Sequence, residues 1–169
     1  SYARHYQTGE QIPPDLLKKA LDAGKFNQGF DTLEYVAAAL LDLEWHTLPA
    51  DAKVEDVAAF EKAALEKHGV DYAPVPPRYR STYFAHVFAG GYSAGYYAYM
   101  WSEVLAADAF AYVKQQGGLN SEVGSRYRRE ILSRGNSEDP MQMYVNWRGS
   151  KPDPQHLLRR RGLSTTPAD

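Results

Sequence analysis

The sequence predicts an all-α protein with several helices. Apolar residues recur at helical spacing in long runs, and prolines and glycines stand where such runs begin and end. No period-two alternation is convincing apart from the short run Thr82 to Val87. The chain has 169 residues, of which 44% are hydrophobic and 24% are charged, as expected for one globular domain.

Two helices are expected in the first fifty residues. Prolines suited to a helix start and a glycine suited to a helix stop predict a short helix from Pro14 to Ala23. A longer helix is predicted within residues 30–48, with Asp31 as its candidate N-cap. Its apolar positions follow the helical period at Leu33, Val36, Ala37, Leu40 and Leu41. Because these positions cover more than one face, we expect this helix to be well buried.

A third helix and a loop follow. Residues 53–70 predict an amphipathic helix that ends at Gly69. Its apolar stripe consists of Val57, Phe60, Ala64 and Leu65. Residues 71–81 contain three prolines, which cannot continue a helix, so we expect an extended loop there.

Further helices are expected in the second half of the chain. The predicted segments are residues 91–118, 121–135, 137–149 and 153–162. The first is closed by Gly117 and Gly118, and the second begins with the capping residue Ser121. The last two each have a proline near the start and a glycine at the end. The absence of a linker predicts one helical unit, residues 1–163, and a polar tail, residues 164–169.

The overall composition excludes several classes of partner and site. The net charge is −2, so neither a nucleic acid nor an anionic membrane is an expected partner. The chain has no cysteine, which excludes disulfides and thiolate metal sites. No apolar run approaches the roughly 18 residues that a membrane-spanning helix requires.

Tyrosines are concentrated in the segment "HVFAGGYSAGYYAYMWSEV", residues 86–104. On a helix with 100° per residue, one face would present Tyr92, Tyr96, Tyr99 and Glu103. These rings are either half-buried packing residues or a row of hydroxyl donors. The second interpretation is favoured because all three are tyrosine and because Gly90 and Gly91, just before them, permit unusual backbone angles and hinge motion.

No complete catalytic or metal-binding motif is present. The five histidines form no H-E-x-x-H pattern, and no nucleophile elbow, phosphate loop or dinucleotide fingerprint is found. Glu103 is either a helix-to-helix hydrogen-bond partner or a substrate contact. Arg126, Arg128 and Arg129 are either solvated and helix-dipole partners or ligands of a substrate carboxylate.

One long segment carries a resemblance to a known family. The stretch "FAHVFAGGYSAGYYAYMWSEVLAADAF" resembles the C-terminal part of the thimet-oligopeptidase family of zinc metallopeptidases, in particular its peptidyl-dipeptidase and oligopeptidase A branch. The similarity continues through "GGLNSEVGSRYRREILSRGNSEDPMQMY" to "DPQHLLRRRGL", and segments upstream also resemble the family. The resemblance implies the multi-helix C-terminal portion of a two-lobed, channel-containing zincin-type metallopeptidase.

The family's zinc-binding H-E-x-x-H helix has no counterpart in this chain. The resemblance therefore implies a fragment of the catalytic domain that is inactive by itself, with zinc in the intact parent protein and none bound here. It implies that His86 and Tyr92 contact the peptide, that Tyr99 stabilises the oxyanion, and that Tyr96 is a secondary contact. Gly90 and Gly91 would let the loop close on the substrate.

Two alternatives remain at this point. The expected partners are an oligopeptide substrate and the upstream part of the same catalytic domain, but a non-enzymatic helical domain that binds peptides or proteins is a rival interpretation. Within the peptidase interpretation, release of C-terminal dipeptides and internal cleavage are both open. We expect a cytoplasmic location, with a periplasmic one as the alternative.

Overall fold

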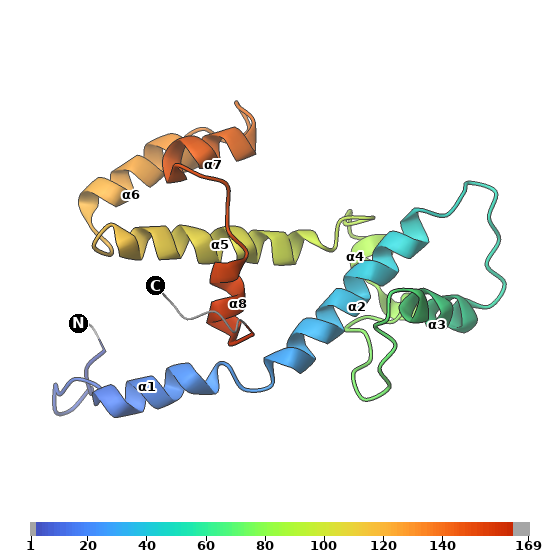
Figure 1. Ribbon diagram of the computed structural model, residues 1–169, viewed down its shortest axis with the longest axis horizontal. Coiled ribbons are helices and arrows are strands. Elements are labelled where there is room, and N and C mark those ends of the chain that lie inside the picture. The colour runs from blue at the N-terminus through green and yellow to red at the C-terminus, as the bar shows by residue number, and fades with distance from the viewer. Residues whose placement is uncertain (1–2, 164–169) are drawn as a thin grey trace.

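The computed structural model describes residues 3–163 and consists of helices joined by loops (Figure 1). Within these residues the only extended pairings are two isolated bridges, between Arg4 and Gln11 and between Tyr72 and Val75. The predicted all-α class is confirmed. The predicted polar tail, residues 164–169, lies outside the described residues. No helix in the described part of the chain is long and apolar enough to cross a membrane.

The first half of the chain forms α1 (Pro14–Ala23), α2 (Gln28–His46) and α3 (Val57–Lys67). The bounds of α1 are those predicted, with proline at its first position. In α2 the prediction of Asp31 as N-cap is wrong. Asn27, with a left-handed φ of 56°, precedes the helix, and Asp31 lies in its first turn.

A short 3₁₀ turn, η1 (Ser81–Tyr83), and a one-turn helix, α4 (Ala85–Phe88), follow the proline-rich loop. The segment from Thr82 to Val87, whose sequence weakly suggested a strand, therefore forms helical turns. A run of six residues with alternating polarity lacks any partner strand here, and its backbone is paired locally instead, for example from Val87 N to Phe84 O.

The second half forms α5 (Ala98–Gln115), α6 (Ser121–Tyr127), the π-helical turn η2 (Arg128–Leu132), α7 (Pro140–Arg148) and α8 (Gln155–Arg161). The cap of α6 is Asn120, whose side chain accepts a 3.0 Å hydrogen bond from Val123 N, rather than the predicted Ser121. Asp139 caps α7 in the same way, at 2.8 Å from Gln142 N.

The predicted start of the long tyrosine helix is wrong by seven residues. Residues 91–97 form turns, and α5 begins only at Ala98. The reason is tertiary: backbone N–H groups of Ala94 and Tyr96 donate to the buried carboxylate of Asp42 on α2 rather than to carbonyls of a preceding helical turn. Ala94 also has a φ of 54°, which is incompatible with a right-handed helix.

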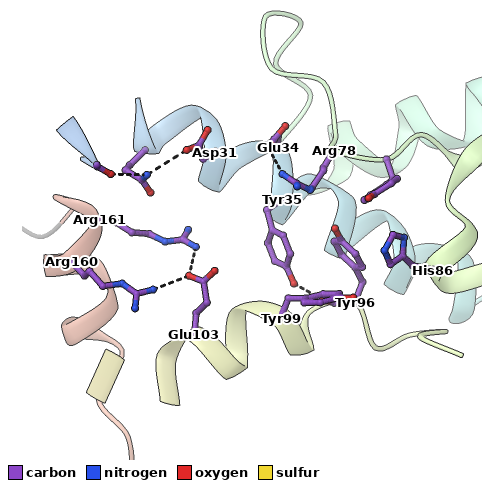
Figure 2. A pocket seen from close by; sticks show the side chains of 13 residues that line it. Asp31, Glu34, Tyr35, Arg78, His86, Tyr96, Tyr99, Glu103, Arg160 and Arg161 are labelled. Carbon is purple, nitrogen blue, oxygen red and sulfur yellow. Dashed lines mark hydrogen bonds and ion pairs between the residues drawn. The ribbon is translucent and has the colours of Figure 1, made fainter. Parts of the chain in front are cut away.

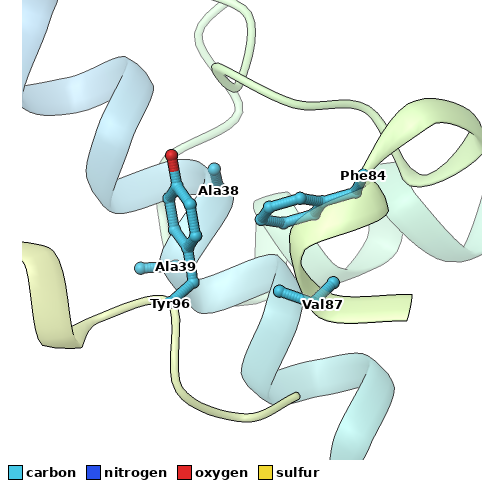
Figure 3. Packing of buried hydrophobic residues seen from close by; sticks show 5 residues of the cluster. All are labelled: Ala38, Ala39, Phe84, Val87 and Tyr96. Carbon is cyan, nitrogen blue, oxygen red and sulfur yellow. The ribbon is translucent and has the colours of Figure 1, made fainter. Parts of the chain in front are cut away.

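Helix α2 is the centre of the core, as its all-round hydrophobicity predicted. Towards α3 it buries a cluster made of Ala37, Leu41, Ala64 and Leu65. Towards α4 and the start of α5 it buries a second cluster, made of Ala38, Ala39, Phe84, Val87 and Tyr96 (Figure 3). Small alanine side chains on α2 let the aromatic rings approach its backbone closely.

The remaining helices pack around α5. Trp147 of α7, which is 1% exposed, packs against Tyr112 of α5 and Tyr127 of α6. Helix α8 packs against α5 on the side that faces α2 (Figure 1). The buried Asp108 of α5 accepts hydrogen bonds from Tyr144 and Arg148 of α7 and so joins the two helices. Thus α2, α4, α5 and α8 converge on one side of the molecule.

Candidate functional site

An open pocket of about 670 Å³ lies where these four elements converge (Figure 2). Helix α2 provides one wall, α4 and the first turns of α5 provide a second, and α8 closes one end. The residues that line it include Asp31, Glu34, Tyr35, Arg78, Tyr79, His86, Tyr96, Tyr99, Glu103, Arg160 and Arg161. Three of the residues expected to act on the peptide, His86, Tyr96 and Tyr99, are among them, as is Glu103.

His86 and the tyrosines form a cluster at the other end of this pocket. The ring centroid of His86 lies 5.8 Å from that of Tyr96 and 6.4 Å from that of Tyr99. Tyr99 is 41% exposed, so its phenol is accessible from the pocket. The imidazole also lies against Tyr79, at a centroid distance of 4.7 Å. Two hydrogen-bonding side chains, an imidazole and a phenol, thus share one accessible surface.

Tyr92 belongs to the cluster but does not line the pocket. Its ring stacks on that of Tyr99 with centroids 5.4 Å apart and an interplanar angle of 13°. The prediction that Tyr92 and Tyr99 share a helix face is wrong, since Tyr92 precedes α5 by six residues. The turn before α5 nevertheless brings the rings of Tyr92 and Tyr99 together.

Gly90 and Gly91 shape the backbone turn next to this cluster. A Cβ at Gly90 would lie 2.9 Å from the carbonyl oxygen of His86, so only glycine allows the chain to turn back so tightly over α4. Gly91 has a φ of +79°, a left-handed value. Tyr92 N then donates to His86 O at 3.0 Å, which ties the turn to α4. Neither glycine lines the pocket.

Tyr96 is a wall of the site more than an exposed donor. Only 3% of it is exposed, and its ring packs on Phe84 and stacks on Tyr35. Burial, together with the neighbouring Tyr79, raises the pKa of Tyr96 to about 12. The residue therefore stays protonated over the whole neutral range.

The pKa of Tyr99 is raised for a different reason. A hydrogen-bonding interaction with the Tyr92 side chain, followed by desolvation, raises the pKa of Tyr99 above its usual value of 10.0. A protonated phenol can donate a hydrogen bond, and the raised pKa extends the range over which Tyr99 can do so to higher pH.

Sequence reasoning missed the contribution of α2. The hydroxyl of Tyr35 donates to the carbonyl oxygen of Tyr96 and accepts from Met100 N at 3.2 Å, so Tyr35 joins α2 to the first turn of α5. A lone tyrosine within the apolar run of α2 was the available signal, because a buried hydroxyl requires a partner. Arg78 also lines the pocket, where Glu34 of α2 accepts its hydrogen bond at 2.8 Å. Nothing in the sequence distinguished Arg78 from the other arginines.

The other end of the pocket is an ion-pair cluster. Glu103 Oε2 lies 2.6 Å from Arg161 and 3.3 Å from Arg160, so α5 is joined to α8 (Figure 2). The helix-to-helix hydrogen bond that was one alternative for Glu103 is therefore present, while Glu103 also lines the pocket. Arg126 is likewise structural, because it donates to Tyr112 Oη and to the carbonyl oxygen of Trp147.

The described residues offer no site for a metal ion. No group of three or more histidine, aspartate or glutamate side chains is placed to bind one within residues 3–163. The zinc ion that the resemblance implies thus has no ligand set in the described part of the chain.

Comparison with known proteins relates the whole helical unit to peptidases. The model of Peptidase family M3 matches residues 1–163. Over 163 residues the chain is 49% identical to the dipeptidyl carboxypeptidase of Escherichia coli, a match that covers 96% of this chain and 24% of that protein. It is 38% identical to the oligopeptidase A of the same organism, with 94% of this chain and 23% of that protein covered. The chain thus spans about a quarter of the length of these curated relatives. On these grounds the chain belongs to peptidase family M3.

Proposed function

We propose that this chain forms the substrate-binding part of a zinc-dependent peptidase that hydrolyses oligopeptides. It would do so within a full-length protein, in which this chain is joined to the further sequence that its relatives have. Release of C-terminal dipeptides is the favoured reaction, because the similarity to a relative named dipeptidyl carboxypeptidase exceeds that to relatives named oligopeptidase A. The peptide would lie in the pocket between α2, α5 and α8.

The observation that carries this proposal is the pairing of His86 and Tyr99 on one accessible pocket surface. Both groups can donate a hydrogen bond to a carbonyl oxygen, and both pack against neighbouring aromatic rings. An extended peptide offers carbonyl oxygens along its length, so such donors fit it.

Tyr99 is the proposed oxyanion donor. When a nucleophile attacks a peptide carbonyl, negative charge grows on the oxygen, and a phenol held in place stabilises that charge more than it stabilises the neutral substrate. By comparison with other oxyanion donors, its loss would cost about 2.7–4 kcal/mol of transition-state stabilisation. The pKa of Tyr99, raised above 10.0, is in keeping with a donor that must remain protonated.

The other members of the cluster would bind and orient the peptide. His86 would donate to the peptide backbone next to the bond that is cleaved. Tyr92, which is exposed next to the pocket, would contact the peptide where it extends beyond the pocket, and would hold Tyr99 by ring stacking. Tyr96, which is nearly covered, would offer a secondary contact at the wall. Gly90 and Gly91 would allow the turn that carries Tyr92 to move as the substrate binds.

Zinc would be held outside the described part of this chain. Since residues 3–163 contain no three-ligand group, they do not fit a zinc ion by themselves. The proposal therefore assigns the metal and the general base to further sequence in the full-length protein, and this chain supplies binding, orientation and a hydrogen-bond donor.

The decisive test is Tyr99→Phe in the full-length protein. We expect kcat to fall about 100-fold to 1000-fold on a short peptide, with KM changed much less, because the phenol acts mainly in the transition state. Tyr97→Phe is the matched control: Tyr97 is 53% exposed, lies on the same segment and does not line the pocket. Turnover by Tyr99→Phe within a few-fold of the unchanged protein would refute the oxyanion role.

A cytoplasmic location is part of the proposal. It is supported only by analogy with a relative from Arabidopsis thaliana whose name is probable cytosolic oligopeptidase A, 40% identical over 168 residues. Cell fractionation of the producing organism tests it, and recovery of the protein in the periplasmic fraction would contradict it.

A further inference from the structure

A buried carboxylate lies directly behind the tyrosine cluster and takes no part in the pocket surface. Asp42, on α2, is 0% exposed and does not line the pocket. A carboxylate in the interior is costly unless its oxygens accept hydrogen bonds. The hydrogen-bond partners of Asp42 therefore indicate its role.

Among residues 3–163, the partners of the Asp42 side chain belong to the turn before α5 or to α2 itself. Oδ1 accepts from Ala94 N at 3.0 Å, and Oδ2 accepts from Tyr96 N at 2.9 Å. On the α2 side, His46 Nδ1 lies 2.8 Å from Oδ1. Two alternate backbone amides of one turn thus converge on one carboxylate, an arrangement that holds a backbone turn firmly around an anion.

The conformation that Asp42 holds is one that the turn would not adopt readily by itself. Ala94 has a φ of 54°, in the left-handed region that residues with a side chain rarely occupy. Strained backbone of this kind persists where the surrounding structure fixes it. Here the fixing group is the carboxylate, since it binds the amide of the strained residue itself.

A second side chain of α2 holds the same backbone two helical turns earlier. Tyr35 precedes Asp42 by seven residues, so both project from the same face of α2. The Tyr35 hydroxyl donates to the carbonyl oxygen of Tyr96 and accepts from Met100 N at 3.2 Å. Asp42 therefore binds backbone groups before Tyr99 in the chain, and Tyr35 binds one group before Tyr99 and one directly after it.

We propose that Asp42, together with Tyr35, is a positioning group for Tyr99: the two side chains fix the turn at Ala94–Tyr96 and the first turn of α5, and so place the phenol that faces the substrate. This inference rests on the proposed function, because it assigns Asp42 a role in turnover that acts through Tyr99. It requires no contact between Asp42 and the peptide.

The first test is Asp42→Asn in the full-length protein. Asparagine keeps the shape but has one acceptor oxygen in place of two, so one of the two amides of the turn loses its partner. We expect kcat to fall at least about tenfold while KM stays within about threefold, since misplacing a reacting group affects turnover more than binding. Asp108→Asn is the matched control, an equally buried aspartate that joins α5 to α7 and to the segment at the start of α8, and not to the turn.

The second test separates positioning from simple stabilisation. Combined with Tyr99→Phe, the change Asp42→Asn is expected to cost less than about twofold in kcat, because the group it positions has already lost its hydroxyl. A merely structural role would reduce kcat by the same factor in both backgrounds. Equal factors, or an Asp42→Asn enzyme with unchanged kcat, would overturn the inference.

Tyr35→Phe keeps the test decisive if Asp42→Asn does not fold. It removes the second set of hydrogen bonds without leaving a buried charge unpaired, and the same pattern is expected: reduced kcat that Tyr99→Phe masks. If Tyr35→Phe reduced kcat by the same factor with and without Tyr99→Phe, the inference would be overturned. Inactivity of the unchanged full-length protein towards peptides, or full activity of Tyr99→Phe, would instead refute the proposed function, so the two failures are distinguishable.

Discussion

The rings of Tyr92 and Tyr99 stack with their centroids 5.4 Å apart and their planes 13° apart, although one ring comes from a turn and the other from the first turn of α5. The interaction between the two side chains is also the leading cause of the raised pKa of Tyr99. The position and the pKa of Tyr99, the proposed donor, thus depend on Tyr92, which does not itself line the pocket.

Replacing Tyr92 by phenylalanine should change how Tyr99 titrates. The ring and its stacking remain, but the interaction of the Tyr92 hydroxyl that raises the pKa of Tyr99 is lost, so the pKa of Tyr99 falls towards 10.0. A donor must be protonated, so the alkaline decline of kcat should begin at lower pH in Tyr92→Phe than in the unchanged protein. NMR of ring-labelled tyrosine gives the pKa directly, and an unchanged Tyr99 titration would contradict the prediction.

Gly90→Ala should disturb the site more than Gly91→Ala. At Gly90 a Cβ would lie 2.9 Å from the carbonyl oxygen and 3.1 Å from the Cα of His86, so the backbone that carries the imidazole must move. At Gly91 no atom lies within 4 Å, and the cost is the left-handed φ, about 1–2 kcal/mol. We expect Gly90→Ala to cause the larger loss of catalytic efficiency, measured from initial rates on a short peptide. Gly29→Ala, in open space on α2 with no left-handed φ, is the control that should keep full activity.

The ion pairs of Glu103 should be weak in stability terms. Glu103 and Arg160 are half exposed, and although Arg161 is only 15% exposed, solvent reaches the Glu103 carboxylate that both arginines share. Solvent therefore screens the attraction, and Glu103→Gln should lower the free energy of unfolding by about 1 kcal/mol. The loss should shrink further at high salt. Urea unfolding at two salt concentrations measures this. If Glu103→Gln instead lowered catalytic efficiency by about 100-fold or more without loss of stability, Glu103 would be a substrate contact.

Asp108 should give the protein an acid-sensitive junction. Burial alone would raise the pKa of Asp108, but hydrogen bonds from Tyr144 and Arg148 outweigh it and lower the pKa below 3.8. The carboxylate therefore contributes stability above pH 3.8, and this contribution is lost as the pH falls through the lowered pKa. Asp108→Asn should cost about 3 kcal/mol at neutral pH, because it leaves Arg148 unpaired, and progressively less in strong acid. Unfolding curves that differ equally at neutral pH and in strong acid would contradict this assignment.

The chain by itself should not hydrolyse peptides. Residues 3–163 hold no three-ligand group, so adding zinc to the isolated chain should give no turnover above the uncatalysed rate. The full-length protein should lose activity on treatment with a chelator and regain it when zinc is restored. Zinc-dependent hydrolysis by the isolated chain would contradict this prediction.

Much of the fold could be predicted because its signals are local. The bounds of α1 follow from a proline at one end and a glycine at the other, and α2 is buried because its own apolar residues cover more than one face. The family resemblance was likewise visible in short stretches of sequence, and it extends over residues 1–163. These features depend on backbone preferences and on side-chain periodicity, which neighbouring residues determine.

Only the tertiary structure decided how the tyrosines are arranged. By local propensity residues 91–97 continue the helix, but Asp42, about fifty positions earlier in the chain, accepts the amides of Ala94 and Tyr96 and holds a turn there. The pocket too is formed by elements distant in sequence, with Tyr35 on α2 and Arg161 on α8. Such long-range contacts leave no periodic pattern in either segment, because each hydrogen bond depends on where two separate helices are packed.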